Sequence, residues 1–202
     1  MIADRRLTAN FRLHEFLQSD TAERYAALND MQYNPPHNIV KNIEYLCGRV
    51  LQPIRSKLGY SIGISSGWRS SALNRKIGGA ETSQHLNAEA ADISLSASFL
   101  QDPVDAYHEV ETEVHNLFGY GLRYDVNANF LLFAYIVLHL EELDVDQVIH
   151  EYGTHRGAPA WVHVSASRAK DKREIMCIGN YTDRRIKDVQ RVDKRTALSW
   201  GV

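Results

Sequence analysis

Residues 90–95 of the chain read Ala-Ala-Asp-Ile-Ser-Leu, a run in which side chains of alternate character follow one another. Because successive side chains of a strand point to opposite faces, the run predicts a strand with Ile93 in the core and Asp92 on the polar face. A second run, Trp161-Val162-His163-Val164-Ser165, alternates in the same way and puts His163 on a polar face. The two runs therefore predict two strands, each with one metal-ligating side chain on its polar face.

Helical patterns surround these strands. Apolar residues recur at steps of three and four between residues 39 and 58, which predicts a long helix that Pro53 kinks and Gly59 ends. Two further helices are expected over residues 102–118, from Asp102-Pro103 onward, and over residues 129–142. The other expected elements are strands over residues 60–65, 145–152 and 174–178, and a short helix over residues 72–77.

Length and composition exclude several classes of protein. The 202 residues are 44% hydrophobic and 24% charged, which is typical of a globular chain that folds without disulfides. The formal net charge of −2 argues against nucleic acid as a partner. The longest apolar run, residues 130–138, is too short for a transmembrane segment, and the N-terminus lacks the apolar region of a signal peptide. Cys47 and Cys177 lack the spacing of a metal or disulfide motif, so we expect them in the core.

His85, Asp92 and His163 are the residues that we expect to hold a metal ion. Zinc binds histidine nitrogen and aspartate oxygen at about 2.0–2.2 Å, so its ligands have to converge on one point. His85 lies in a polar loop that leads into the strand of Asp92, and a loop can close a gap that on a helix would be about 10.5 Å. Three ligands leave a fourth position open, which is typical of catalytic zinc.

Short blocks of sequence around these residues occur in a characteristic order. They are Ser65-Ser66-Gly67-Trp68-Arg69-Ser70, Leu73-Asn74, Gly78-Gly79, Ser83-Gln84-His85, Ala90-Ala91-Asp92-Ile93 and Trp161-Val162-His163-Val164-Ser165. The series resembles the zinc D-Ala-D-Ala carboxypeptidase and L-alanyl-D-glutamate endopeptidase family of bacteria and their phages. Members of that family carry S-G-Y-R-S, then S-x-H-x-x-G-x-A-x-D, then W-x-H-x-S. The resemblance extends over roughly residues 10–100 and 143–180.

The resemblance implies the fold that this family shares with the hedgehog signalling domain. That fold is α+β, with a small antiparallel sheet that carries a zinc site and is flanked by helices. We expect a single peptidase-like domain over residues 1–182, with a helical insertion at about residues 97–142 that packs on the core. Residues 183–202 alternate in charge and are expected to form a charged C-terminal tail or arm.

The resemblance also implies roles for individual residues. His85, Asp92 and His163 would be the zinc ligands, and Arg69 would bind a carboxylate of the substrate. A planar guanidinium suits that task because it can bind a carboxylate through two parallel hydrogen bonds. Ser83 and Gln84 would brace the loop of His85 or touch the substrate; these two roles remain open here.

The chain departs from the family pattern at three places. Trp68 stands where the family usually has Tyr, and Ala88 stands where it has Gly. If position 88 requires a positive φ, alanine costs about 1 kcal/mol or more there. The acid that many members place two or three residues before the last histidine ligand is absent, since Ala160 and Trp161 occupy those positions.

Glu151 is the candidate for the missing catalytic base. If residues 145–152 and 161–165 form neighbouring antiparallel strands, Glu151 lies close to Trp161 and His163. The phage-type branch of the family has a similar D-Q-L-I-x-E block, which supports this choice. His150 and His155 are the alternatives, as groups that stabilise the oxyanion.

The function implied is that of a zinc-dependent peptidase, of the D-Ala-D-Ala carboxypeptidase or L-Ala-D-Glu endopeptidase type, that hydrolyses peptide bonds in peptidoglycan stem peptides. Because no signal peptide is visible, we expect a protein made in the cytoplasm that reaches the cell wall as a released phage endolysin or a virion-associated lysin. Two alternatives remain: a catalytically inactive module that binds wall peptides, and a structural component of a phage virion that contacts other virion proteins.

Overall fold

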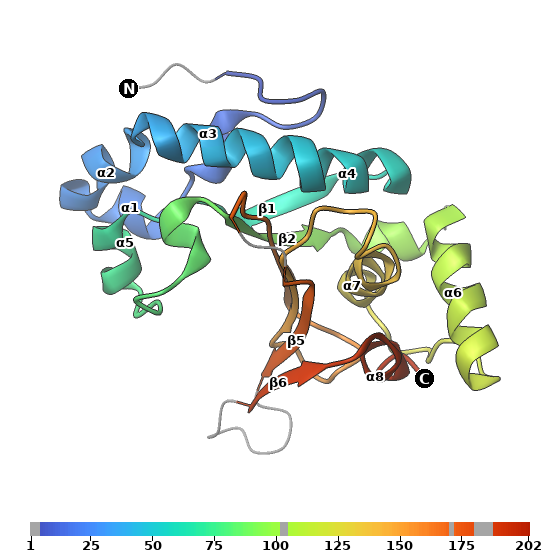
Figure 1. Cartoon of the computed structure of the whole chain (residues 1–202). Helices are drawn as coiled ribbons and strands as arrows, with labels where there is room; N and C mark the ends of the chain where they lie inside the picture. Colours follow the sequence, from blue (N-terminus) through green and yellow to red (C-terminus); the bar gives the residue numbers. More distant parts are fainter. Residues whose placement is uncertain (1–4, 102–104, 170–171, 180–187) are drawn as a thin grey trace.

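The computed structural model describes residues 5–101, 105–169, 172–179 and 188–202 (Figure 1). Its helices are α1 Asp20–Arg24, α2 Ala26–Tyr33, α3 His37–Leu46, α4 Gln52–Leu58, α5 Ser71–Lys76, α6 Asp105–Phe118, α7 Ala128–Leu138 and α8 Lys194–Ser199. Its strands are β1 Ile62–Ser66, β2 Ala90–Leu95, β3 Gln147–Glu151, β4 Trp161–Ser165, β5 Glu174–Gly179 and β6 Asp188–Val192. The structure combines these helices with one six-stranded sheet, which confirms the α+β class.

The six strands form one sheet in the order β1-β2-β4-β3-β5-β6. Within the described residues the neighbouring pairs are antiparallel except β3 and β5, which run parallel. The sheet is therefore mixed, and the β3–β5 pair departs from the expected antiparallel arrangement. The reason is that β5 follows β4 in the chain and runs opposite to it, but pairs with the far side of β3, which is itself antiparallel to β4.

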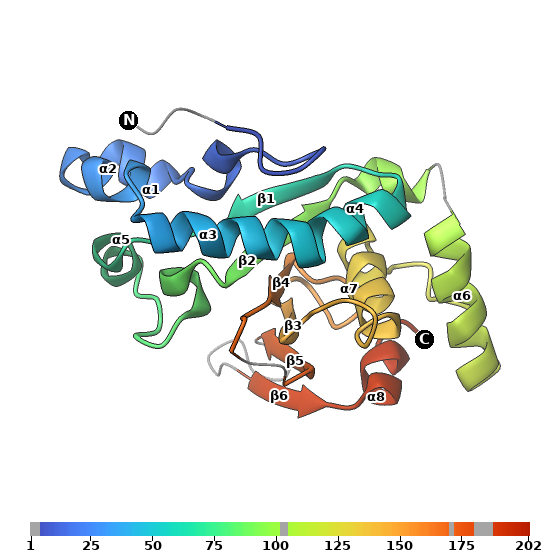
Figure 2. The ribbon, with the colours of Figure 1, turned by 45° about the horizontal axis from the view of Figure 1, so that its top comes forward.

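Helix α7 covers the apolar face of the sheet. Its residues 130–137 are all buried, and it packs against β2, β3 and β4 (Figure 2). The end of the chain reinforces this layer, since α8 packs on α7 and buries Leu198 and Trp200. The opposite face of the central strands is thereby left for the polar side chains of Asp92 and His163.

The long helix predicted over residues 39–58 is present as α3 and α4, joined by a π-helical turn at Cys47–Leu51. Pro53 lies in the first turn of α4. A proline ring cannot donate a backbone hydrogen bond and clashes with the carbonyl one turn earlier, so a wider turn before it accommodates the ring. Gly59 ends α4 with a left-handed φ of 62°, as predicted, and Cys47 is buried in the core, as predicted.

Residues 97–142 are expected to form a helical insertion and residues 183–202 a charged arm. The described parts of both stretches pack against the rest of the structure. Residues 97–142 contain α6 and the core helix α7, which ends at Leu138; Asp102-Pro103, the predicted helix start, lies outside the described residues. Of residues 183–202, the described part from 188 onward pairs as β6 with β5 and then forms α8. Its alternating charges belong to an edge strand and a surface helix.

Two further observations concern membrane-spanning helices and the cysteines. Among the described residues, no helix combines the length and the apolarity that crossing a bilayer requires. Cys177 is buried like Cys47, and neither cysteine is part of a disulfide.

Ala88 has a left-handed backbone, with φ 55° and ψ 31°, so the expectation of a positive φ at this position is confirmed. The residue ends the turn that carries His85, and its amide donates to the carbonyl of His85 at 3.2 Å. Its methyl group is buried, with 1% exposure. A side chain is therefore tolerated here at the cost of backbone strain.

We expect Ala88→Gly to change the free energy of unfolding by less than about 1 kcal/mol, because the relief of strain is offset by the lost methyl and the gain in unfolded-state entropy. Ala88→Val should cost about 2 kcal/mol or more, because a β-branched residue fits this backbone poorly. Urea denaturation measures both values. Equal stability of the two variants would show that the left-handed turn is not required.

Candidate metal centre

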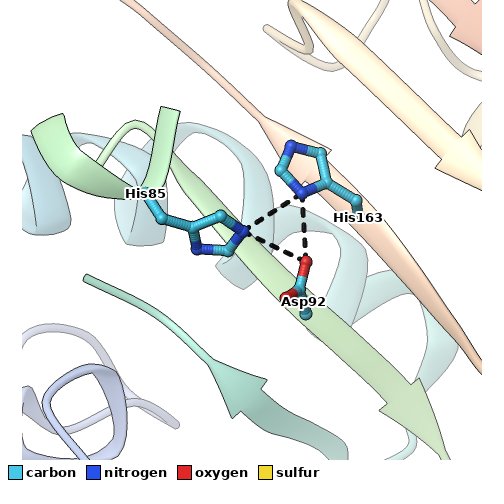
Figure 3. A group of neighbouring side chains, drawn as sticks. All are labelled: His85, Asp92 and His163. Atoms are coloured by element: carbon cyan, nitrogen blue, oxygen red, sulfur yellow. Dashed lines mark hydrogen bonds and ion pairs between the residues drawn. The ribbon is translucent and has the colours of Figure 1, made fainter. Parts of the chain in front are cut away.

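The sheet register brings two of the three expected ligands together. Asp92 of β2 and His163 of β4 are direct partners in the antiparallel pairing, so their side chains lie on the same face. His85 comes from the 3-10 turn Gln84–Asn87 that precedes β2, and its ring points at the other two (Figure 3). All three residues are buried.

The three inward atoms form a nearly equilateral triangle. Asp92 Oδ1 lies 3.0 Å from His163 Nδ1 and 3.2 Å from His85 Nε2, and the two nitrogens are 3.2 Å apart. Ligands placed tetrahedrally at about 2.0–2.1 Å from zinc are separated by about 3.4 Å. The donor set and its spacing therefore fit a tetrahedral zinc ion with a fourth position open.

Each imidazole ring also has a nitrogen that points away from the triangle, and the hydrogen-bond partner of that nitrogen determines which ring nitrogen carries the hydrogen. His85 Nδ1 lies 2.6 Å from the carbonyl oxygen of Gly67, which only accepts, so Nδ1 carries the hydrogen and Nε2 has a free lone pair. His163 Nε2 lies 3.3 Å from the side-chain oxygen of Gln84, and donation there leaves a lone pair on Nδ1. Together with the Asp92 carboxylate, these lone pairs make three hydrogen-bond acceptors that face one another with no hydrogen between them. A cation bound between them would remove their mutual repulsion.

The turn that carries His85 is fastened to the segment around Gly67. The backbone amide of Arg69 donates to the carbonyl of His85 at 3.0 Å, and the indole of Trp68 donates to the carbonyl of Leu86 at 3.1 Å. A Cβ at Gly67 would lie 2.6 Å from the carbonyl oxygen of Phe16, so only glycine allows this close approach. The tryptophan that replaces the family's tyrosine thus ties the His85 turn in place.

Charge and burial act on the ligands in opposite directions. Burial lowers the pKa of the His85 imidazole, although Asp92 counteracts part of this effect, so the ring is held neutral and able to bind a metal. The Asp92 carboxylate is paired with the guanidinium of Arg69, whose Nη2 donates to Oδ2 at 2.8 Å and favours the charged form. Asp92 is therefore ionised.

Arg69 binds the outer oxygen of Asp92. Its Nη2 donates to Asp92 Oδ2 at 2.8 Å and its Nε donates to Ser66 Oγ at 2.9 Å. The carboxylate that Arg69 contacts in the structure is thus that of a metal-site residue. Arg69 also lines the cavity beside the site, so its predicted contact with a substrate carboxylate stays a prediction.

A cavity of about 530 Å³ opens next to the triangle. Asp92 and Arg69 line it on the sheet side, Trp161 lines it from β4, and residues 18–21 line it from the N-terminal segment. The cavity is large enough for a short peptide segment, since small-molecule sites typically span about 300–1,000 Å³.

Ser83 and Gln84 contribute to the loop in different ways. Ser83 precedes the 3-10 turn, and its carbonyl accepts the backbone amide of Leu86 at 3.1 Å. Gln84 uses its side chain, which lies between His163 and a second residue, Asp146. The structure therefore supports the bracing role for both, and a contact with substrate stays a prediction.

Glu151 lies at the end of β3, opposite Trp161 of β4, and the predicted antiparallel pairing of these two strands is confirmed. The indole of Trp161 donates to Glu151 Oε2 at 2.9 Å. His163 is two residues further along β4 than Trp161, so Glu151 and His163 share a face of the sheet. The structure therefore places Glu151 on the same face of the sheet as His163, two residues along the β3–β4 ladder.

His150 is wrong as an oxyanion stabiliser, because it lies on the other face of β3. Its ring is fully buried between the aromatic rings of Phe133 and Trp200, with centroids 5.5 and 5.4 Å away. Side chains alternate along a strand, so placing Glu151 at the site necessarily turns His150 into the core. His155 lies in the β3–β4 connection, where its Nε2 is 3.4 Å from the Asp125 carboxylate.

Burial lowers the pKa of His150 to about 4. The unfolded chain binds this proton already near pH 6.5, so the group destabilises the fold progressively as the pH falls from 6.5 to about 4, by on the order of 3 kcal/mol. In His150→Gln we expect the free energy of unfolding to fall less steeply as the pH decreases through this range, because unfolding of the variant takes up about one proton fewer. The exposed His37→Gln is the control, and an equal change in both variants would contradict the assignment.

Asp146 is a residue of the site that the sequence analysis missed. It is 1% exposed, and its Oδ2 accepts a hydrogen bond of 2.8 Å from the side-chain amide of Gln84. The only available signal was its place at the start of the D-Q-V-I-H-E block that ends with Glu151. Nothing in that block indicates a contact with residue 84.

The fold and site together define an α+β protein with a buried His-Asp-His centre suited to a divalent metal. The family model of peptidase M15 matches residues 9–121, more than half of the chain. The chain therefore belongs to the peptidase M15 family, the zinc D-Ala-D-Ala carboxypeptidase family, whose members are zinc-dependent metallopeptidases. The matched region includes Arg69, His85 and Asp92 and ends before His163 and Glu151. No curated protein matches the chain.

Proposed function

We propose that this protein is a zinc peptidase that hydrolyses peptide bonds in peptidoglycan stem peptides, with His85, Asp92 and His163 as the zinc ligands. One observation carries the proposal: three acceptor atoms lie within 3.2 Å of one another, and the outer hydrogen bonds of both rings leave lone pairs facing inward. The family supports the same chemistry and the same class of substrate.

Zinc bound at this centre would supply a Lewis acid that polarises the scissile carbonyl and lowers the pKa of a water molecule. Glu151 is the general base in this proposal. Its carboxylate takes a proton from the attacking water and delivers it to the nitrogen of the leaving amine, so that one carboxylate serves both proton transfers. The hydrogen bond to Oε2 comes from the indole of Trp161, which itself lines the cavity.

Arg69 is the proposed anchor for a substrate carboxylate. A guanidinium has five N–H donors, and Asp92 and Ser66 each accept one of them. The position of Arg69 in the cavity wall supports the use of the remaining donors for a carboxylate of the stem peptide. The same arrangement keeps one oxygen of Asp92 occupied and leaves the other to the metal.

The biological setting belongs to the same proposal. We infer a lysin of the phage endolysin or virion-associated type, which acts on the cell wall as a carboxypeptidase or an L-Ala-D-Glu endopeptidase. The second candidate is an inactive module that binds wall peptides; the absence of an acid at Ala160 and Trp161 favours it. The two candidates differ in whether Glu151 acts as a base.

Glu151→Gln should bind zinc like the wild type but lose activity by about 10²–10⁴-fold, because the amide cannot take up the proton. His163→Ala should lose both zinc and activity. Metal content by elemental analysis and muropeptide release by mass spectrometry measure the two properties, and the products identify the bond that is cut. The exposed Glu81→Gln is the control. Full activity in Glu151→Gln would remove Glu151 as the base, and no digestion by the zinc-loaded wild type would favour the binding module.

A further inference from the structure

A partly buried chain of hydrogen bonds leads away from the metal centre behind His163. His163 Nε2 lies 3.3 Å from Gln84 Oε1, and Gln84 Nε2 donates to Asp146 Oδ2 at 2.8 Å. The three residues come from β4, from the turn of His85 and from the start of β3, so the chain connects segments 62 and 79 residues apart in sequence.

Asp146 is held rigidly at the far end of this chain. Its other oxygen, Oδ1, accepts the backbone amide of Lys172 at 3.0 Å. Its own amide donates to the carbonyl of Ser165 at 2.8 Å, and its carbonyl accepts the amide of Glu174 at 2.9 Å. Strands β4 and β5 thus fix the backbone of this residue, and the Lys172 amide and the Gln84 side chain fix its carboxylate, which is buried.

The chemistry of the chain sets the direction of every proton in it. An ionised carboxylate only accepts hydrogen bonds, so the Gln84 amide has to turn its NH2 group toward Asp146 and its oxygen toward His163. That oxygen also only accepts, so its partner on His163 is a hydrogen carried by Nε2. Nδ1 is then left with a lone pair that faces Asp92 and His85.

We propose that Asp146 and Gln84 are positioning residues that select the metal-binding tautomer of His163 and thereby raise the affinity of the site for zinc. The inference rests on the proposed metal centre. Outer partners of metal-ligating histidines typically change metal affinity by about 10–100-fold when they are removed. Here the effect passes through an amide, whose orientation the carboxylate controls.

Asp146→Asn tests this role with almost no change in shape. The introduced amide can keep its oxygen on the Lys172 amide only by turning its NH2 group toward Gln84. Gln84 then has to rotate its own NH2 group toward His163, which moves the ring hydrogen to Nδ1, where the metal should bind. We expect the Kd for zinc to rise about 10–100-fold and the tautomer to reverse.

Asp146→Asn/Gln84→Glu provides the rescue. The introduced carboxylate at position 84 can accept from the amide at position 146 and from His163 Nε2, so the original proton direction returns at the original net charge. We expect zinc affinity within a few-fold of the wild type in this double variant. Gln84→Met is a further variant: it removes the amide altogether and should also weaken zinc binding.

Glu174→Gln is the matched control. The side chain of Gln147 donates to the carboxylate of Glu174 at the neighbouring position of the sheet, so this pair has the same chemistry without a contact to a ligand of the metal. Its zinc affinity should equal that of the wild type. A loss that merely follows stability would appear in the control as well.

Two measurements are made on each variant: zinc affinity by competition with a chelator, and the His163 tautomer by ¹⁵N NMR of the metal-free protein at pH 7.5. Unchanged affinity and tautomer in Asp146→Asn, or the absence of rescue in the double variant, would overturn the inference. Failure of the wild type to bind zinc would instead overturn the proposed function. The NMR result separates the two because it requires no metal.

Discussion

The structure depends on one constraint: three hydrogen-bond acceptors are held within 3.2 Å of one another in a buried place. Without a cation between them, the lone pairs of two rings and one carboxylate repel each other. The surrounding protein holds them there all the same, through the β2–β4 register, the Gly67 carbonyl and the Gln84 amide. A cation bound between the three atoms would remove this repulsion, so the contacts that position the ligands also favour the binding of a metal.

The alternation of side chains along a strand explains how β3 serves two purposes. Glu151 faces the metal side and contacts Trp161, while His150, the preceding residue, is buried against Phe133 and Trp200. One residue is available for chemistry and the other contributes to the packing of α7 and α8. A shift of the β3–β4 register by one residue would exchange the two side chains, so the interior packing of His150 also secures the place of Glu151.

Short-range patterns predicted most of the fold and the places of Asp92 and His163, because strand alternation and helical periodicity are local properties. Asp92 and His163 follow from two alternating runs, and α3–α4 follows from its apolar stripe. The parallel pairing of β3 with β5 and the packing of α8 on α7 depend on where distant segments meet, and no local pattern encodes that. Asp146 was missed for the same reason, since its link to His163 passes through Gln84, 62 residues away.

The departures from the family pattern are compensated within the same small region. Ala88 keeps the left-handed turn that glycine would adopt without strain, and the chain around it supplies extra fastening: the Trp68 indole binds the Leu86 carbonyl, and the Arg69 amide binds the His85 carbonyl. Strained backbone persists where its surroundings over-determine it, and here those surroundings are the segment that also places Arg69 on Asp92. In the proposed mechanism Glu151 takes the place of the acid that is missing before His163, and it pairs with Trp161, which occupies one of the positions where the family has that acid. The region from Gly67 to Asp92 and the pair β3–β4 are therefore linked by direct hydrogen bonds, through Arg69 to Asp92 and through Gln84 to His163.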